Sequence, residues 1–172
     1  MRIISGTHRG ARIAAPKGMS TRPTSDRVRE NAFNLIGPVD GADVLDLFAG
    51  SGAMGLEALS RGAASAVFVE SDRDACRAIN ANLDRLGLHA TVLCQDVQRA
   101  VAAARRSYDL VLCDPPYDYD PSRLLPRLGG LVAPDGLLVY ESSKRADPPE
   151  PPGLDQTTSR TYGSARLTLF RR

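Results

Sequence analysis

The chain has 172 residues, of which 42% are hydrophobic and 24% are charged, a composition typical of a single globular domain. Its formal net charge is +2, and its apolar runs are far shorter than the roughly 20 residues that a membrane-spanning helix needs. These values argue against a multidomain machine, a disordered scaffold or a membrane protein, so we expect one soluble domain.

The N-terminus and the cysteines give expectations about location and metal chemistry. Residues 1–10 contain no apolar segment typical of a signal peptide, so we expect a cytoplasmic protein. Cys76, Cys94 and Cys113 lie in apolar stretches without a C-x-x-C pair, and we expect buried free thiols. His8 and His89 belong to no cluster with ligand spacing, so no metal is expected.

Basic charge is concentrated at the start of the chain. Residues 1–29 hold seven basic side chains and one acidic one, so this segment carries +6 and the other 143 residues carry −4. A cationic segment is what binding to a phosphate backbone requires, although a solvated arginine-rich surface stays an open alternative. The candidate RNA contacts are Arg2, Arg9, Arg12, Lys17 and Arg22, and the segment also contains Arg27 and Arg29.

The first elements form an arm and a helix. Alternation around Gly6 and Gly10 predicts a short hairpin or extended arm over residues 3–15. We therefore divide the chain into a basic arm, residues 1–24, and a domain, residues 25–172. Asp26 is expected to cap a helix that ends at residues 37–38. The expected apolar face of this helix consists of Val28, Ala32, Leu35 and Ile36.

From residue 43 onward, strands and helices alternate. Strands are expected at 44–48, 66–70, 90–94, 108–113 and 137–141, and helices at 53–61, 73–86, 97–104 and near 121–128. This order predicts an α/β fold with a largely parallel sheet that is covered on both faces. The proline-rich residues 147–153 are typical of a loop, and segments 156–162 and 165–171 are expected to form a hairpin at one edge of the sheet.

A glycine turn after the first strand of this series predicts a nucleoside cofactor. Gly50, Gly52 and Gly55 form G-x-G-x-x-G between a strand and a helix, the context that gives this motif meaning. Glu70 ends the next strand, where its carboxylate can accept both hydroxyls of a ribose. Asp46 would repel a dinucleotide pyrophosphate but attract an ammonium group, so the charge favours S-adenosylmethionine.

The third strand of the series is followed by another acidic residue. Asp96 could accept the amino group of adenine or cap the helix that begins at Val97, and both roles can hold together. The full set of candidate cofactor contacts is Asp46, Phe48, Gly50, Gly52, Glu70, Asp96 and Val97.

The tetrapeptide Asp114-Pro115-Pro116-Tyr117 follows the fourth strand of the series, where ligands of parallel sheets bind. Asp114 and the carbonyl of Pro115 could each accept one N–H of an exocyclic base amine, while Tyr117 stacks on the base. These three are the candidate catalytic residues, acting by positioning and electrostatic stabilisation. Residues 118–120 are expected to form a solvated rim or lid.

The glycine turn and the D-P-P-Y loop together resemble class I S-adenosylmethionine-dependent methyltransferases that methylate amines. With residues 2–6, 22–30 and 33–34 included, the whole chain resembles the RsmD family of 16S rRNA guanine-N2 methyltransferases. The resemblance implies a Rossmann-like, seven-stranded, mostly parallel sheet with an antiparallel last strand and helices on both faces. It also implies methylation of guanine 966, a small-subunit particle as substrate and the residue roles given above. We expect a monomer.

Three other functions are weighed against this one. DNA adenine-N6 methylation also uses D-P-P-Y, but the adjacent N1–H and N2–H donors of guanine suit an acceptor-only carboxylate better. A nicotinamide-dependent oxidoreductase would leave the D-P-P-Y loop unused. A non-catalytic RNA-binding module would use only the basic arm.

Overall fold

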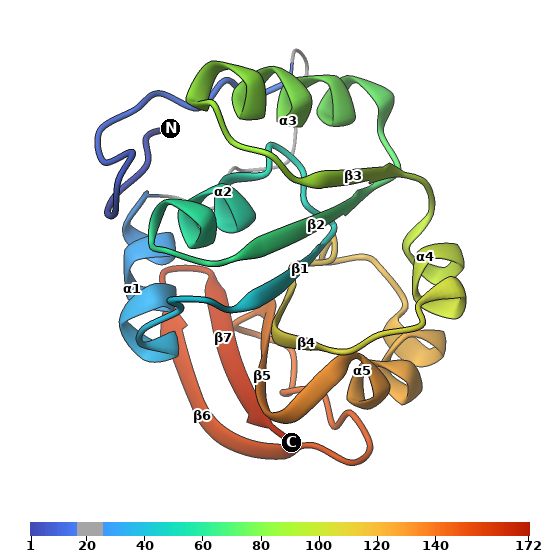
Figure 1. Ribbon diagram of the computed structural model, residues 1–172. Helices are drawn as coiled ribbons and strands as arrows, with labels where there is room; N and C mark the ends of the chain where they lie inside the picture. The colour runs from blue at the N-terminus through green and yellow to red at the C-terminus, as the bar shows by residue number, and fades with distance from the viewer. Residues whose placement is uncertain (17–25) are drawn as a thin grey trace.

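The computed structural model describes residues 1–16 and 26–172 and contains a seven-stranded sheet of order β3-β2-β1-β4-β5-β7-β6 (Figure 1). The strands are β1 (Asp43–Leu47), β2 (Ser65–Glu70), β3 (Thr91–Cys94), β4 (Tyr108–Cys113), β5 (Val132–Ser143), β6 (Asp155–Tyr162) and β7 (Ala165–Arg171). The first five are parallel, and β7 lies antiparallel between β5 and β6. The predicted α/β fold, its antiparallel last strand and the edge hairpin are confirmed.

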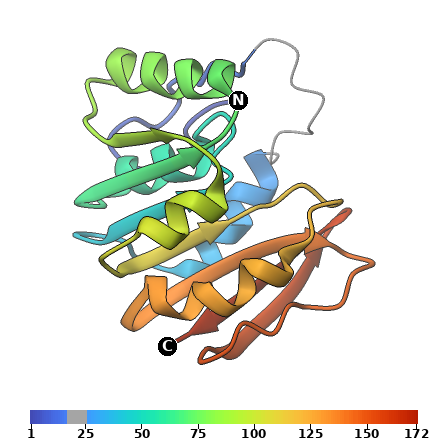
Figure 2. The same cartoon turned by 90° about the vertical axis from the view of Figure 1, so that its right-hand side faces the viewer.

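Helices cover both faces of the sheet. They are α1 (Asp26–Ile36), α2 (Ala53–Ser60), α3 (Arg73–Leu86), α4 (Val97–Ala103), the 3-10 turn η1 (Pro121–Arg123) and α5 (Leu125–Leu131). One core packs α1, α2 and α3 against one face, and a second core packs α4 and α5 against the other (Figures 1 and 2). A central strand must therefore bury both of its faces: in β1, Val44 joins the first core and Leu45 the second.

Local capping signals explain why α3 begins and ends where the sequence predicts. The Asp72 carboxylate accepts a hydrogen bond from Ala75 N, which satisfies a donor of the first turn (2.8 Å). Gly87 ends the helix in the left-handed region, with φ of 64°, and its N–H returns to Asp84 O. Both signals are short-range, so they are readable in the sequence.

The expected apolar face of α1 does pack against the first core: Ala32 is buried, and Val28, Leu35 and Ile36 are partly buried there. Arg29 and Phe33 are buried as well, which was not expected. One expectation about a helix and one about a cysteine are wrong. The single helix expected near residues 121–128 is divided into η1 and α5. Cys94 is exposed because it ends β3, which is an edge strand of the sheet. Cys76 and Cys113 are buried free thiols, as expected.

The described part of the arm, residues 1–16, packs on the domain. Ile3 N donates to Ala11 O (2.9 Å), and the side chains of Ile3 and Ile13 are buried in the first core. Thr7 N donates to Ser60 O (2.8 Å) at the end of α2, and Ala14 N donates to the side chain of Asn82 on α3 (2.9 Å). These contacts fix the arm beside α2 and α3 (Figure 1).

Candidate active site

The turn between β1 and α2 has the backbone shape that its glycines predict. Phe48, Gly50 and Gly52 all have positive φ, at 59°, 55° and 77°. Gly52 N donates to Ala49 O (2.7 Å), which closes the turn just before α2 begins. Gly52, the N-cap residue of α2, has no side chain to cap the helix, and the N-terminus of a helix is a favourable place for an anionic or polar ligand group.

Gly55, the last glycine of the motif, is required by close packing. A methyl group on Gly55 would overlap the ring of Phe68 and lie 3.0 Å from Asp46 Oδ2. The absence of a side chain lets Gly55 N donate to Asp46 Oδ2 (2.9 Å). The third glycine therefore places the buried carboxyl group rather than a ligand.

Asp46 is a buried carboxyl group near the end of β1, with only 4% of its surface exposed. Burial raises its pKa from 3.8 to about 7; the hydrogen bond from Gly55 opposes the shift, and the charges of Asp114 and Glu70 add to it. It makes no ion pair within residues 1–16 and 26–172. A cationic group bound beside it would relieve this unfavourable charge.

Glu70 holds the glycine turn as well as facing the ligand edge. One carboxylate oxygen accepts from Gly50 N (2.8 Å), and the other accepts from Asp72 N (2.8 Å). Each oxygen keeps a further lone pair for a ligand hydroxyl. The sequence motif pointed to a ribose contact and missed this second task, which depends on β1 and β2 being neighbours.

Asp96 and Val97 begin α4 at the carboxyl end of β3. Asp96 is exposed and accepts from Arg99 N (3.2 Å), so it is the N-cap that the sequence offered as one of two roles. The Val97 side chain is buried in the second core. Its backbone, rather than its side chain, is therefore the part that could reach a ligand.

The D-P-P-Y loop leaves β4 beside the glycine turn. Asp114 N lies 3.5 Å from Leu47 O, its acceptor on the neighbouring strand, which continues the parallel ladder by one residue. Pro115 is buried, whereas Tyr117 is 57% exposed. An exposed aromatic ring at the edge that carries the glycine turn has a shape that suits a flat ligand.

Tyr119 differs from the expected solvated rim. Its ring meets the ring of Phe48 edge-on, with centroids 4.9 Å apart, and its hydroxyl accepts a hydrogen bond from Gln98. It therefore ties the D-P-P-Y loop to the glycine turn and to α4. Asp118 and Asp120 are exposed, as the expected rim requires.

A further carboxyl group, which the sequence reading missed, lies at the same edge. The strand register places Asp46, Leu112 and Val139 in one row across β1, β4 and β5. Asp114 and Glu141 follow Leu112 and Val139 by two residues, so their side chains project from the same face of the sheet as Asp46. Burial, and then the charge of Asp114, raise the pKa of Glu141 from 4.5 to about 8.

The candidate RNA contacts lie mostly on the surface. Arg2, Arg9 and Arg12 are exposed, whereas Lys17 and Arg22 lie outside the described residues. Arg29, which the charge count included, is fully buried: its Nε lies 3.4 Å from Glu57 Oε2, so it is not available to RNA.

Glu57 is the residue that explains this burial, and no local sequence pattern pointed to it. Its two carboxylate oxygens accept from Ile4 N (2.8 Å) and Ser5 N (3.0 Å), and Oε1 also accepts from Arg61 Nε (2.7 Å). The ion pair between Arg29 and Glu57 therefore anchors the arm on α1 and α2.

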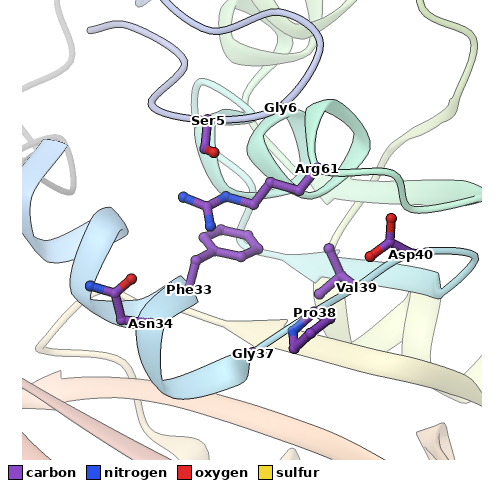
Figure 3. Close-up of a pocket in the computed structure, with 9 residues that line it drawn as sticks. All are labelled: Ser5, Gly6, Phe33, Asn34, Gly37, Pro38, Val39, Asp40 and Arg61. Atoms are coloured by element: carbon purple, nitrogen blue, oxygen red, sulfur yellow. The ribbon is translucent and has the colours of Figure 1, made fainter.

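A hollow of about 400 Å³ lies between the arm, the end of α1 and α2 (Figure 3). Its walls include Gly6, Phe33, Pro38 and Arg61, and the Arg61 guanidinium lies 4.6 Å from the centre of the Phe33 ring. Because residues 38–40 lead into the amino end of β1, this hollow lies at the edge of the sheet opposite the candidate active site.

Within residues 1–16 and 26–172, no helix has the length and apolarity to cross a membrane. In the same residues, no three or more His, Cys, Asp or Glu side chains group together as a metal site. The cytoplasmic location and the monomeric state stay predictions.

Comparison with known proteins gives consistent matches along the chain. A family model described as "Conserved hypothetical protein 95" matches residues 1–171. "Putative rRNA methyltransferase YlbH" of Bacillus subtilis is 41% identical, covering 100% of this chain and 99% of that protein. "Ribosomal RNA small subunit methyltransferase D" of Escherichia coli is 35% identical, covering 100% and 90%.

Solved structures agree with these relatives. "Putative methyltransferase yhhF from Escherichia coli" superposes with a TM-score of 0.90 at 34% identity, covering 100% of this chain and 97% of that one. The fold also occurs, at 16% identity and a TM-score of 0.64, in "SMU.776, a putative methyltransferase complexed with SAH".

Proposed function

The chain belongs to the RsmD family of methyltransferases, and we propose that it transfers a methyl group from S-adenosylmethionine to N2 of guanine 966 in 16S rRNA, within assembled small-subunit particles. The observation that carries this proposal is the position of Asp114 at the sheet edge that also holds the glycine turn and buried Asp46.

The residues at this edge fit the charge and shape of the cofactor. Asp46 is a buried carboxyl group without a cationic partner among the described residues, and it would hold the cofactor ammonium. Glu70 would accept the ribose hydroxyls, and Asp96, exposed at the end of β3, would accept the adenine amino group. The remaining proposed contacts are Phe48, Gly50, Gly52 and Val97.

The residues proposed for the methyl transfer itself lie in the D-P-P-Y loop. S-adenosylmethionine supplies an electrophilic methyl carbon bonded to positively charged sulfur. The N2 lone pair of guanine forms a bond to this carbon while the C–S electron pair goes to sulfur, and one N2 proton must then leave. Asp114 and the Pro115 carbonyl would orient the two N–H groups. Asp114 would accept the departing proton, and exposed Tyr117 would stack on the base.

The arm supplies charge for the RNA backbone. Arg2, Arg9 and Arg12 are exposed on a segment that Glu57 and Arg29 hold against α2. A fixed cationic surface can bind phosphates without an ordering cost at each encounter. Lys17 and Arg22, which lie outside the described residues, are proposed as further RNA contacts on the strength of their charge alone.

The test is methyl transfer to small-subunit particles that lack this modification, followed by nucleoside mass spectrometry. We expect N2-methylguanosine from the wild-type protein and a loss of orders of magnitude for Asp114→Ala, with cofactor affinity nearly unchanged, because the contact acts mainly in the transition state. Asp118→Ala is the matched control, since Asp118 is exposed in the same loop.

Other outcomes would support the competing functions. N6-methyladenosine in DNA would indicate a DNA enzyme. Calorimetric affinity for NAD without affinity for S-adenosylmethionine would indicate an oxidoreductase, and RNA binding without transfer would indicate a binding module. Wild-type turnover in Asp114→Ala would contradict the proposed mechanism.

A further inference from the structure

The proposed mechanism leaves one carboxyl group of the active-site edge unused. Glu141 lies on β5 directly after Tyr140, which pairs with Cys113, so Glu141 is the strand neighbour of Asp114. Adjacent strands are about 4.8 Å apart, and both side chains project from the same face. Glu141 is partly buried, and its carboxyl group makes no hydrogen bond or ion pair with any of the described residues.

Among the described residues near Glu141, no basic side chain forms an ion pair with its carboxyl group. On β7 its register partner is Leu167, and the neighbouring Arg166 is bonded to Lys144 O (3.1 Å). On α1, Arg29 pairs with Glu57 and with Asp26. Among the described residues, the charged group that acts on Glu141 is Asp114, and its charge is negative.

We propose that Glu141 is a specificity-determining residue that contacts the target base in its neutral form, accepting from N1–H and donating to O6, while Asp114 accepts from N2–H. This inference rests on the proposed transfer to guanine. When the base is bound, its N1–H and O6 supply a donor and an acceptor for the carboxyl group of Glu141.

The electrostatics of Asp114 and Glu141 favour one charged and one neutral carboxyl group. Two adjacent carboxyl groups disfavour a second negative charge, and with its pKa raised to about 8 Glu141 keeps its proton at neutral pH. A carboxylate and a neutral acid side by side present acceptor, acceptor and donor to a base edge. Guanine offers the complementary order of N2–H, N1–H and O6, whereas adenine offers a donor and an acceptor at its Watson–Crick edge.

The test compares two variants at Glu141 on RNA with guanine or 2-aminopurine at the target position. 2-Aminopurine keeps the N2 amino group but lacks both N1–H and O6. Glu141→Gln keeps one donor and one acceptor, and we expect it to retain kcat/KM within a few-fold of wild type. Glu141→Ala is expected to lose roughly 10- to 100-fold on guanine, with the preference for guanine over 2-aminopurine reduced by a similar factor.

The pH profile gives a readout that a structural role would not change. Wild-type kcat/KM should fall as the pH rises through about 8, where Glu141 loses its proton, and Glu141→Gln should lack this descending limb. Glu150→Gln is the matched control, because Glu150 is exposed in the loop after β5. Urea unfolding of each variant checks that it is folded.

The outcomes separate this inference from the proposed function. Failure of the wild-type protein to methylate guanine would overturn both. Guanine transfer by the wild-type protein with an unchanged base preference in folded Glu141→Ala, or with the same descending limb in Glu141→Gln, would overturn the role of Glu141 alone.

Discussion

Replacement of Asp46 by Asn should make the protein more stable and less able to bind its cofactor. The pKa of Asp46 is raised from 3.8 to about 7, chiefly by burial, so the folded state holds this proton more tightly than the unfolded chain. The folded state is therefore stabilised by the neutral carboxyl group in full below pH 4, and this stabilisation is lost as the pH rises through about 7.

The magnitude follows from the size of the shift. About 3 pH units at about 1.4 kcal/mol per unit set an upper limit of about 4 kcal/mol for the cost of ionised Asp46 above pH 7. Asn is neutral, and its side-chain oxygen can still accept a hydrogen bond from Gly55 N. This hydrogen bond is weaker than the one to a carboxylate, which reduces the gain in stability by about 1 kcal/mol. We expect Asp46→Asn to gain about 2 to 3 kcal/mol at pH 8 and almost nothing at pH 4.

Urea unfolding at both pH values measures the gain, with Asp147→Asn, a change in an exposed loop, as the control. Calorimetric titration should show S-adenosylmethionine affinity lower by roughly 30-fold, since a hydrogen bond to a charged group is worth about 2 kcal/mol. A variant that is no more stable than wild type at pH 8 would refute the burial argument. Unchanged affinity would refute the ammonium contact.

Gly55→Ala should destabilise the protein by about 1 to 3 kcal/mol in urea unfolding, because the added methyl group overlaps a buried ring; Gly130→Ala, in open space on α5, should not destabilise it. Glu57→Gln should cost about 3 kcal/mol and raise amide hydrogen exchange in the arm, because it removes the buried one of the two carboxylates that pair with the Arg29 guanidinium and leaves only the exposed Asp26; exchange limited to global unfolding would contradict this. Arg9→Ala should reduce the slope of log RNA affinity against log salt concentration by about 1, whereas Arg160→Ala on the edge strand should not. Equal slopes for Arg9→Ala and the wild-type protein would show that the arm has a structural role only.

Features set by short-range signals were predicted closely. The bounds of α3 follow from Asp72 and Gly87, which lie next to the residues they cap. The glycine turn was predicted because its three glycines are close together in the chain. The alternation of strands and helices likewise gave a parallel sheet, since each βαβ unit is local.

Features that depend on long-range pairing were missed. Arg29 was counted with the basic arm because its partner, Glu57, lies on another helix. Glu141 becomes a neighbour of Asp114 only through the register of β4 and β5. Tyr119 looked like a loop residue because its contact with Phe48 joins two separate strand ends. The one available signal for Glu141 was an acidic residue at the end of an otherwise apolar strand.

The seat of the arm on α2 and α3 has a consequence for synthesis on the ribosome. Residues 1–16 are translated early, yet Ile4 bonds to Glu57 and Ala14 to Asn82, which follow 53 and 68 residues later. At 5 to 20 residues per second, the interval before Asn82 is made is about 3 to 14 seconds. During that time Ile3 and Ile13 lack their burial partners, so the nascent segment is open to chaperones and docks only after the polypeptide behind it has emerged.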